Sequence, residues 1–159
     1  IYPVIRGKTN GRIALVRHHS HRSLPIRKNE NMDELSILRS HPAQIEELFI
    51  ALNQYEAVVT SAMHVYITCQ SYGIPVSLIS FKGFENAVHG DGSKYLDYAE
   101  GAGVTPRVPH VVPLDLRHID ITNLLTNEKI SEEKFNEVEI TLIGAIDCYQ
   151  KMNENIKIS

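Results

Sequence analysis

A histidine and a serine follow one predicted strand of this chain, where their side chains could do chemistry. The strand covers residues 56–60, Ser61 comes next, and His64 falls in the first turn of the helix predicted after it. The positive end of a helix dipole disfavours a charged imidazole and favours a neutral one, which can accept a proton or hold an anion through its N–H. We therefore expect His64 to be catalytic, the alternative being a histidine that only hydrogen-bonds the nearby backbone. Ser61 is predicted to cap the helix and to contact the substrate.

A second reactive group, Arg17-His-His-Ser-His-Arg22, follows directly on the apolar run 12–16. Guanidinium and imidazole groups bind phosphate and carboxylate, so we predict Arg17 and His18 as substrate-binding residues. A metal site is not favoured, because the three imidazoles are too close in sequence to converge and the group holds no Cys, Asp or Glu. A solvated basic loop is the alternative.

A third group lies in and after the glycine-bearing segment 82–92. His89, Lys94 and Asp97 are predicted to bind substrate, although Lys94 and Asp97 could also form an ordinary ion pair across one helical turn. The segment lacks the Gly-Lys-Ser/Thr of a phosphate-binding P-loop, and neither a Gly-x-Gly-x-x-Gly fingerprint nor a Gly-x-Ser-x-Gly elbow occurs. No cofactor or metal is predicted.

The elements that must position these groups alternate between strand and helix. Apolar runs predict strands at 12–16, 56–60 and 76–81, with a further candidate at 110–114 and a short strand or helical turn at 32–38. Helical spacing, Pro42, Gly73 and the serines before 94 and 132 predict helices at 42–53, 62–72, 94–100 and from 132 onward, with a short helix or turn at 119–125. This alternation is typical of an α/β fold: a Rossmann-like parallel sheet with helices on both faces, whose ligand loops lie at the carboxyl ends of the strands.

Composition limits the function classes. The chain has 159 residues, 43% hydrophobic and 22% charged, with a formal net charge of −3. That size suits one domain covering residues 1–159, and the charge does not favour nucleic-acid binding. No apolar run is long enough for a membrane span. Cys69 and Cys148 lie in apolar helical contexts that predict buried free thiols and a cytoplasmic location. The chain begins at Ile1 rather than at a methionine, and it shows no signal-peptide pattern. We therefore expect a fragment of a longer protein.

One stretch resembles a known family. Val58-Val-Thr-Ser-Ala-Met-His64, the helix after it and Gly73-Ile-Pro-Val76 are similar to the C-terminal half of polysaccharide pyruvyl transferases, which shows a buried strand, Ser-Arg-x-His, a helix and Gly-x-Pro. Lys94-Tyr-Leu-Asp97-Tyr98 resembles the Lys-x-x-Asp-aromatic segment of the succinoglycan-type, ketal-forming members. The likeness covers less than half of the chain.

The resemblance implies the C-terminal domain of a GT-B-like, two-domain transferase of exopolysaccharide biosynthesis, whose N-terminal domain is missing here. Such enzymes transfer a pyruvyl group from phosphoenolpyruvate to two hydroxyls of a saccharide acceptor. His64 would match the family histidine, as an acid/base or phosphoenolpyruvate-contacting group. Ala62 stands where the common family pattern has arginine, and Arg17, His18 or Lys94 could supply that positive charge instead.

Two other functions stay open from the sequence. Neutral imidazoles and cations at one sheet edge suit the phosphates of a nucleotide-sugar donor as well as an anionic three-carbon donor. The chain could therefore be the nucleotide-sugar-binding half of a GT-B glycosyltransferase. It could also be a degenerate Rossmann-like module that binds a ligand or a partner domain without catalysis.

Overall fold

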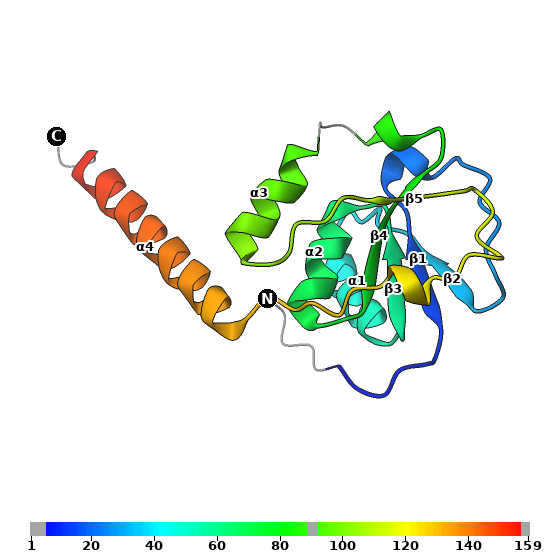
Figure 1. Cartoon of the computed structure of the whole chain (residues 1–159). Coiled ribbons are helices and arrows are strands. Elements are labelled where there is room, and N and C mark those ends of the chain that lie inside the picture. Colours follow the sequence, from blue (N-terminus) through cyan, green and yellow to red (C-terminus); the bar gives the residue numbers. More distant parts are fainter. Residues whose placement is uncertain (1–5, 89–91, 157–159) are drawn as a thin grey trace. The chain divides into compact units, whose positions relative to one another are not determined.

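The chain forms a five-stranded, all-parallel sheet of Rossmann-like α/β type, which confirms the predicted fold class (Figure 1). The computed structural model describes residues 6–88 and 92–156, except the side chains of 147–156. The chain divides into two compact units, Ile1–Lys129 with the sheet and Ile130–Ser159. Strand order is β2-β1-β3-β4-β5. The strands are β1 (Ile13–Val16), β2 (Met32–Leu35), β3 (Ala57–Thr60), β4 (Val76–Phe81) and β5 (His110–Val112).

The helices of the first unit connect these strands. They are α1 (Pro42–Asn53), α2 (Met63–Tyr72) and α3 (Ser93–Ala102), with the 3-10 helices η1 (His19–His21), η2 (Glu85–Ala87) and η3 (Thr122–Leu124). The predicted bounds of α1 are confirmed, and the uncertain segments 32–38 and 119–125 contain a strand and a 3-10 helix. Two predicted caps are wrong. Ala62 and Gly92, rather than Ser61 and Ser93, are the N-cap residues of α2 and α3.

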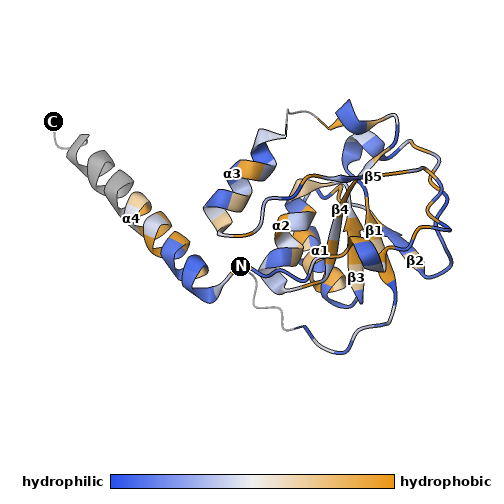
Figure 2. Ribbon diagram, viewed as in Figure 1, coloured by the Kyte–Doolittle hydropathy of each residue, from blue (hydrophilic) through white to orange (hydrophobic). Residues whose placement is uncertain are grey.

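Alternating side chains of the strands build one apolar cluster on each face of the sheet. In Figure 2 the central strands are largely coloured as hydrophobic. On one face Val58 and Leu78 pack with residues of α1 and α2, and tyrosines of α3 join them. On the other face Val59 and Ile79 pack with Leu116 and with residues of and beside η3. Every residue of β3 and β4 is buried, as expected for parallel strands covered on both sides.

Cys69 belongs to the first cluster, and burial raises the pKa of its thiol. It is fully buried and free, as the sequence predicts. The side chain of Cys148 lies outside the described residues.

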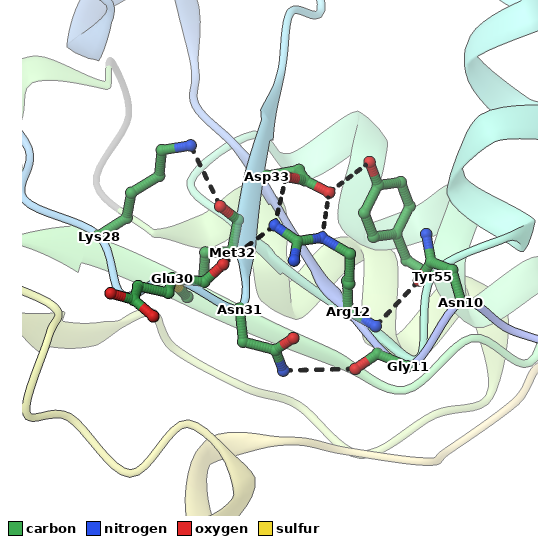
Figure 3. Close-up of polar contacts among 9 residues, drawn as sticks. All are labelled: Asn10, Gly11, Arg12, Lys28, Glu30, Asn31, Met32, Asp33 and Tyr55. Atoms are coloured by element: carbon green, nitrogen blue, oxygen red, sulfur yellow. Dashed lines mark hydrogen bonds and ion pairs between the residues drawn. The ribbon is translucent and has the colours of Figure 1, made fainter.

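A polar network joins the amino-terminal ends of β1, β2 and β3 (Figure 3). Arg12 donates from Nε and Nη2 to the two carboxylate oxygens of Asp33, both at 2.6 Å, and Tyr55 donates to Asp33 Oδ2 at 3.2 Å. The hydrogen bond from Arg12 lowers the pKa of Asp33. This network holds the short strand β2 against β1 at the edge remote from the candidate site.

The second unit contains helix α4 (Glu132–Ile156). The hydroxyl of Ser131 accepts from the N–H of Lys134 at 3.1 Å, which confirms Ser131 as its N-cap. Its apolar side chains Val138, Leu142 and Ile146 are exposed. No helix within the described part of the chain is long and apolar enough to cross a membrane.

Gly73 closes α2 with φ of 66°, in the left-handed region that L side chains rarely adopt. Gly73→Ala should therefore lower the free energy of unfolding by about 1–2 kcal/mol. Gly101 is the matched control, because it lies inside α3 with nothing near its missing Cβ. Gly101→Ala should leave stability unchanged or raise it by up to about 1 kcal/mol. Urea denaturation measures both, and equal effects would contradict the assignment of Gly73 as the left-handed cap.

Candidate functional site

The strand order places a topological switch point between β1 and β3. The connection from β1 to β2 packs Leu24 and Ile26 on one face of the sheet, whereas the connection from β3 to β4 packs α2 on the other. Connections that leave adjacent strands on opposite faces open a crevice at the carboxyl ends, where open α/β sheets bind their ligands. His18 follows β1, and Ser61 and His64 follow β3, so the structure brings these three predicted residues to this crevice.

A buried hydrogen-bond network, here called the Ser61–His21 bridge, ties the loops of this edge together. The hydroxyl of Ser61 accepts from the backbone N–H of His18 at 2.9 Å and lies 2.9 Å from Nδ1 of His21. Nε2 of His21 lies 3.3 Å from the carbonyl oxygen of Phe84. Since a carbonyl can only accept, Nε2 carries the proton, and Ser61 donates its own proton to Nδ1. The bridge thus joins the loops after β1, β3 and β4, and η1 and η2 lie close together at this edge (Figure 1).

Burial keeps His21 neutral. Its side chain is fully buried and meets the ring of Phe81 edge-on, with 5.2 Å between centroids. Desolvation lowers the pKa of His21 and is the largest effect; the bond to Phe84 opposes it in part, and the charge of Arg17 adds a smaller lowering. The bridge also explains why the N-cap prediction for Ser61 is wrong: its hydroxyl is occupied by His18 and His21.

His18 and His64 form the imidazole part of the crevice. Burial lowers the pKa of His18 to about 4, and His19, His21, Lys94 and His64 add to this effect electrostatically. Nδ1 of His18 accepts from the N–H of Ser20 at 3.3 Å, so the proton of the neutral ring lies on Nε2. His64 is exposed, and its ring makes no hydrogen bond within the described part of the chain.

The N-terminus of α2 carries donors beside His64. Its N-cap, Ala62, offers no capping side chain. Among residues 6–88 and 92–156, the backbone N–H groups of Met63 and His64 have no acceptor. Unpaired N–H groups at the positive end of a helix dipole are suited to hold an anion.

A pocket of about 250 Å³, here called the Lys94 pocket, opens at the carboxyl ends of β3 and β4. It includes Ser61 and Lys94, and the Lys94 ammonium lies 5.2 Å from the centroid of the Tyr95 ring. Asp97 lies farther along α3, exposed, and does not line the pocket. His89, also predicted to bind substrate, lies outside the described residues.

The side chain of Arg17 stabilises the loop after β1. It donates from Nε to Glu34 at 2.7 Å and from Nη1 to the carbonyl oxygens of His21 and Leu24, both at 2.8 Å. It lines a different pocket from Lys94. The structure therefore separates two residues that the sequence grouped as substrate-binding.

Sequence reasoning missed Ser80, Glu85 and Tyr95, which also line the Lys94 pocket. Backbone N–H groups of Glu85 and Gly83 lower the pKa of the Glu85 carboxyl. A serine inside the apolar strand β4 was a usable signal for Ser80, although Ser77 of the same strand carries this signal and does not line the pocket. Nothing in the sequence distinguishes Glu85 from other loop acids. Within the described residues, no three His, Cys, Asp or Glu side chains are grouped to hold a metal ion.

Fold and site together define a Rossmann-like α/β domain with an imidazole-rich crevice at its switch point. Comparison with family models, with curated proteins and with solved structures gives no match.

The bridge leads to a stability prediction. Ser61→Ala removes the partner of a buried imidazole and of a backbone N–H, and should lower the free energy of unfolding by about 1–3 kcal/mol. Ser77 is the matched control, because it is equally buried and its hydroxyl has no hydrogen-bond partner in the described chain. Ser77→Ala should be neutral or stabilising. Chemical denaturation that gives both variants the same stability would contradict the bridge.

The free energy of unfolding should also decrease as the pH is lowered from about 6.5 to about 4. The folded chain lowers the pKa of His18 and His21, so the unfolded chain, whose histidines titrate near about 6.5, takes up protons first. Above that pH, their contribution to the free energy of unfolding is complete. It is lost as the pH falls toward the pKa of the folded state, by at most about 1.4 kcal/mol per pH unit for each proton taken up. Urea titrations at several pH values measure it.

The variant His18→Asn should make the free energy of unfolding depend less steeply on pH, because it removes one of the two histidines whose pKa is lowered by folding. The exposed His118 provides the control, and His118→Asn should leave the slope as in the wild type. A stability that is constant or rises on acidification over this window would contradict the burial argument.

Proposed function

We propose that this chain is a pyruvyl-transferase-like domain that binds phosphoenolpyruvate at the switch point and contributes His64 to its transfer onto a saccharide. The observation that carries the proposal is the exposed His64 on an uncapped helix N-terminus, beside a neutral His18 and near Lys94. In agreement with the resemblance, the segment runs through β3, Ser61-Ala-Met-His64, α2, Gly73-Ile-Pro75 and β4 in the family's order.

The charges of the donor suit this environment. Phosphoenolpyruvate carries a carboxylate and a phosphate, and the N–H groups of Met63 and His64, which have no acceptor among the described residues, can donate hydrogen bonds to one of them. The ammonium of Lys94 supplies a full positive charge within electrostatic reach of His18. These groups take the place of the arginine that the family carries at the position of Ala62.

Transfer of the pyruvyl group requires proton transfers that an imidazole can carry out. When two saccharide hydroxyls add to C2 of phosphoenolpyruvate, the C2–oxygen bond to phosphate breaks. One hydroxyl proton ends on C3, which becomes a methyl group, and the other leaves with inorganic phosphate. His64 is assigned to take a proton from an attacking hydroxyl, because its ring is exposed at the crevice and a ring nitrogen of imidazole can accept a proton.

The proposal predicts that phosphoenolpyruvate protects the chain against thermal unfolding. A ligand at a hundredfold excess over its Kd stabilises the native state by about 2.7 kcal/mol. His64→Ala should weaken phosphoenolpyruvate binding about tenfold by calorimetry, because it removes a direct contact. His118→Ala, which changes an exposed histidine elsewhere, should leave it unchanged.

Other ligands separate the alternatives. Protection by UDP or GDP but not by phosphoenolpyruvate would support a nucleotide-sugar-binding domain instead. Absence of protection by any of them would leave a binding module without this chemistry. Normal binding and normal turnover of His64→Ala, measured together with the N-terminal domain that the resemblance implies, would remove His64 from the mechanism.

A further inference from the structure

A second pocket, here called the Arg22 pocket, lies at the carboxyl ends of β1 and β2. Its volume is about 300 Å³, at the lower end of small-molecule sites. Arg17, His19 and Arg22 of the β1–β2 connection line it together with Glu34 and Ser36 of the β2 segment. None of these residues lines the Lys94 pocket, whose walls come from the β3, β4 and β5 segments and α3.

The charges of the Arg22 pocket do not balance. Glu34 accepts from Nε of Arg17 at 2.7 Å and pairs with Nη2 at 2.5 Å, so this carboxylate is already neutralised. The Arg17 side chain is only 12% exposed and is also held by two carbonyl oxygens. The side chain of Arg22, in contrast, makes no hydrogen bond or ion pair with any residue in the described part of the chain, although its backbone N–H donates to the carbonyl oxygen of His19 at 3.3 Å. One fixed positive charge therefore faces the pocket, in a chain with a formal net charge of −3.

Polar donors surround this charge. The hydroxyl of Ser36 accepts from the N–H of Leu38 at 3.1 Å, which leaves its own proton for another acceptor. The ring of His19 packs on His18, with centroids 4.1 Å apart, and makes no hydrogen bond to a described residue. Leu38, 54% exposed, adds an apolar wall. A guanidinium fork with a hydroxyl and an imidazole beside it matches the oxygens of phosphate or carboxylate.

We infer that the Arg22 pocket binds the phosphate or carboxylate of a second ligand, separate from the group held beside His64. Resting on the proposed function, this ligand is the saccharide acceptor, which then carries an anionic group of its own. Two positions at one sheet edge, each with its own cation, allow the donor and the acceptor to bind together without competing for one charge.

The test uses glucose 1-phosphate, glucuronate, inorganic phosphate and neutral glucose as probes of the isotope-labelled chain. One or both anionic saccharides should shift the backbone amide signals of residues 19–22 and 36–38, whereas glucose should not. Arg22→Ala should weaken binding about tenfold. Arg27 is the matched control, because it is an exposed arginine of the same connection that does not line the pocket, and Arg27→Ala should change the affinity less than twofold.

Four results would overturn the inference. The first is that Arg22→Ala and Arg27→Ala weaken the binding of the anionic saccharide equally, and the second is that amide signals shift only at the Lys94 pocket. The third is that inorganic phosphate binds but neither anionic saccharide does, and the fourth is that no probe binds. His118→Ala, which changes an exposed histidine elsewhere, should leave the affinity for the anionic saccharide unchanged. Binding at the Arg22 pocket without protection by phosphoenolpyruvate would thus overturn the proposed donor and leave the second anion site in place.

Discussion

The carboxyl edge of this sheet depends on one buried hydroxyl. Ser61 accepts from the backbone of the β1 loop and donates to an imidazole that in turn donates to the β4 loop. Because both partners are buried, loss of either would leave polar atoms without a hydrogen bond in an apolar surrounding. Arg17 strengthens the arrangement by holding the carbonyl oxygens of His21 and Leu24. The geometry of the crevice therefore follows from a network whose central side chains, Ser61 and His21, are buried.

Within and beside this network, chemically similar side chains have different roles. Burial keeps His21 neutral and structural, and it lowers the pKa of the half-buried His18 to about 4, so neither adds positive charge near neutral pH. Permanent charge comes instead from Lys94 and Arg22, in two separate pockets. The imidazoles of His18 and His21 stay neutral beside these cations because both rings are desolvated.

Much of the architecture could be predicted from sequence because its signals are local. The apolar run before Ser61, the helix closed by Gly73 and the strand after Pro75 each follow from neighbouring residues. The polar contacts could not be predicted, since Ser61 and His21 are brought together by strand pairing rather than by sequence proximity. The run Arg17 to Arg22 is uniform in type, and only the fold decides that one of its histidines is buried and that its arginines face the pocket beside β2.

The division into two pockets has a topological cause. β1 lies between β2 and β3, and its loop is the only one of this edge, within the described chain, that reaches both neighbours: Arg17 pairs with Glu34 of β2, and the backbone of His18 bonds to Ser61 after β3. The side chains of the loop therefore divide between the two sides: Arg17, His19 and Arg22 line the pocket beside β2, whereas His21 lies 2.9 Å from Ser61 after β3. A single basic segment then supplies a neutral imidazole to one crevice and a cation to the other. Under the proposed function, this division lets one short, histidine-rich loop contribute to the binding of two anionic groups at once, which a uniformly solvated basic loop would not do.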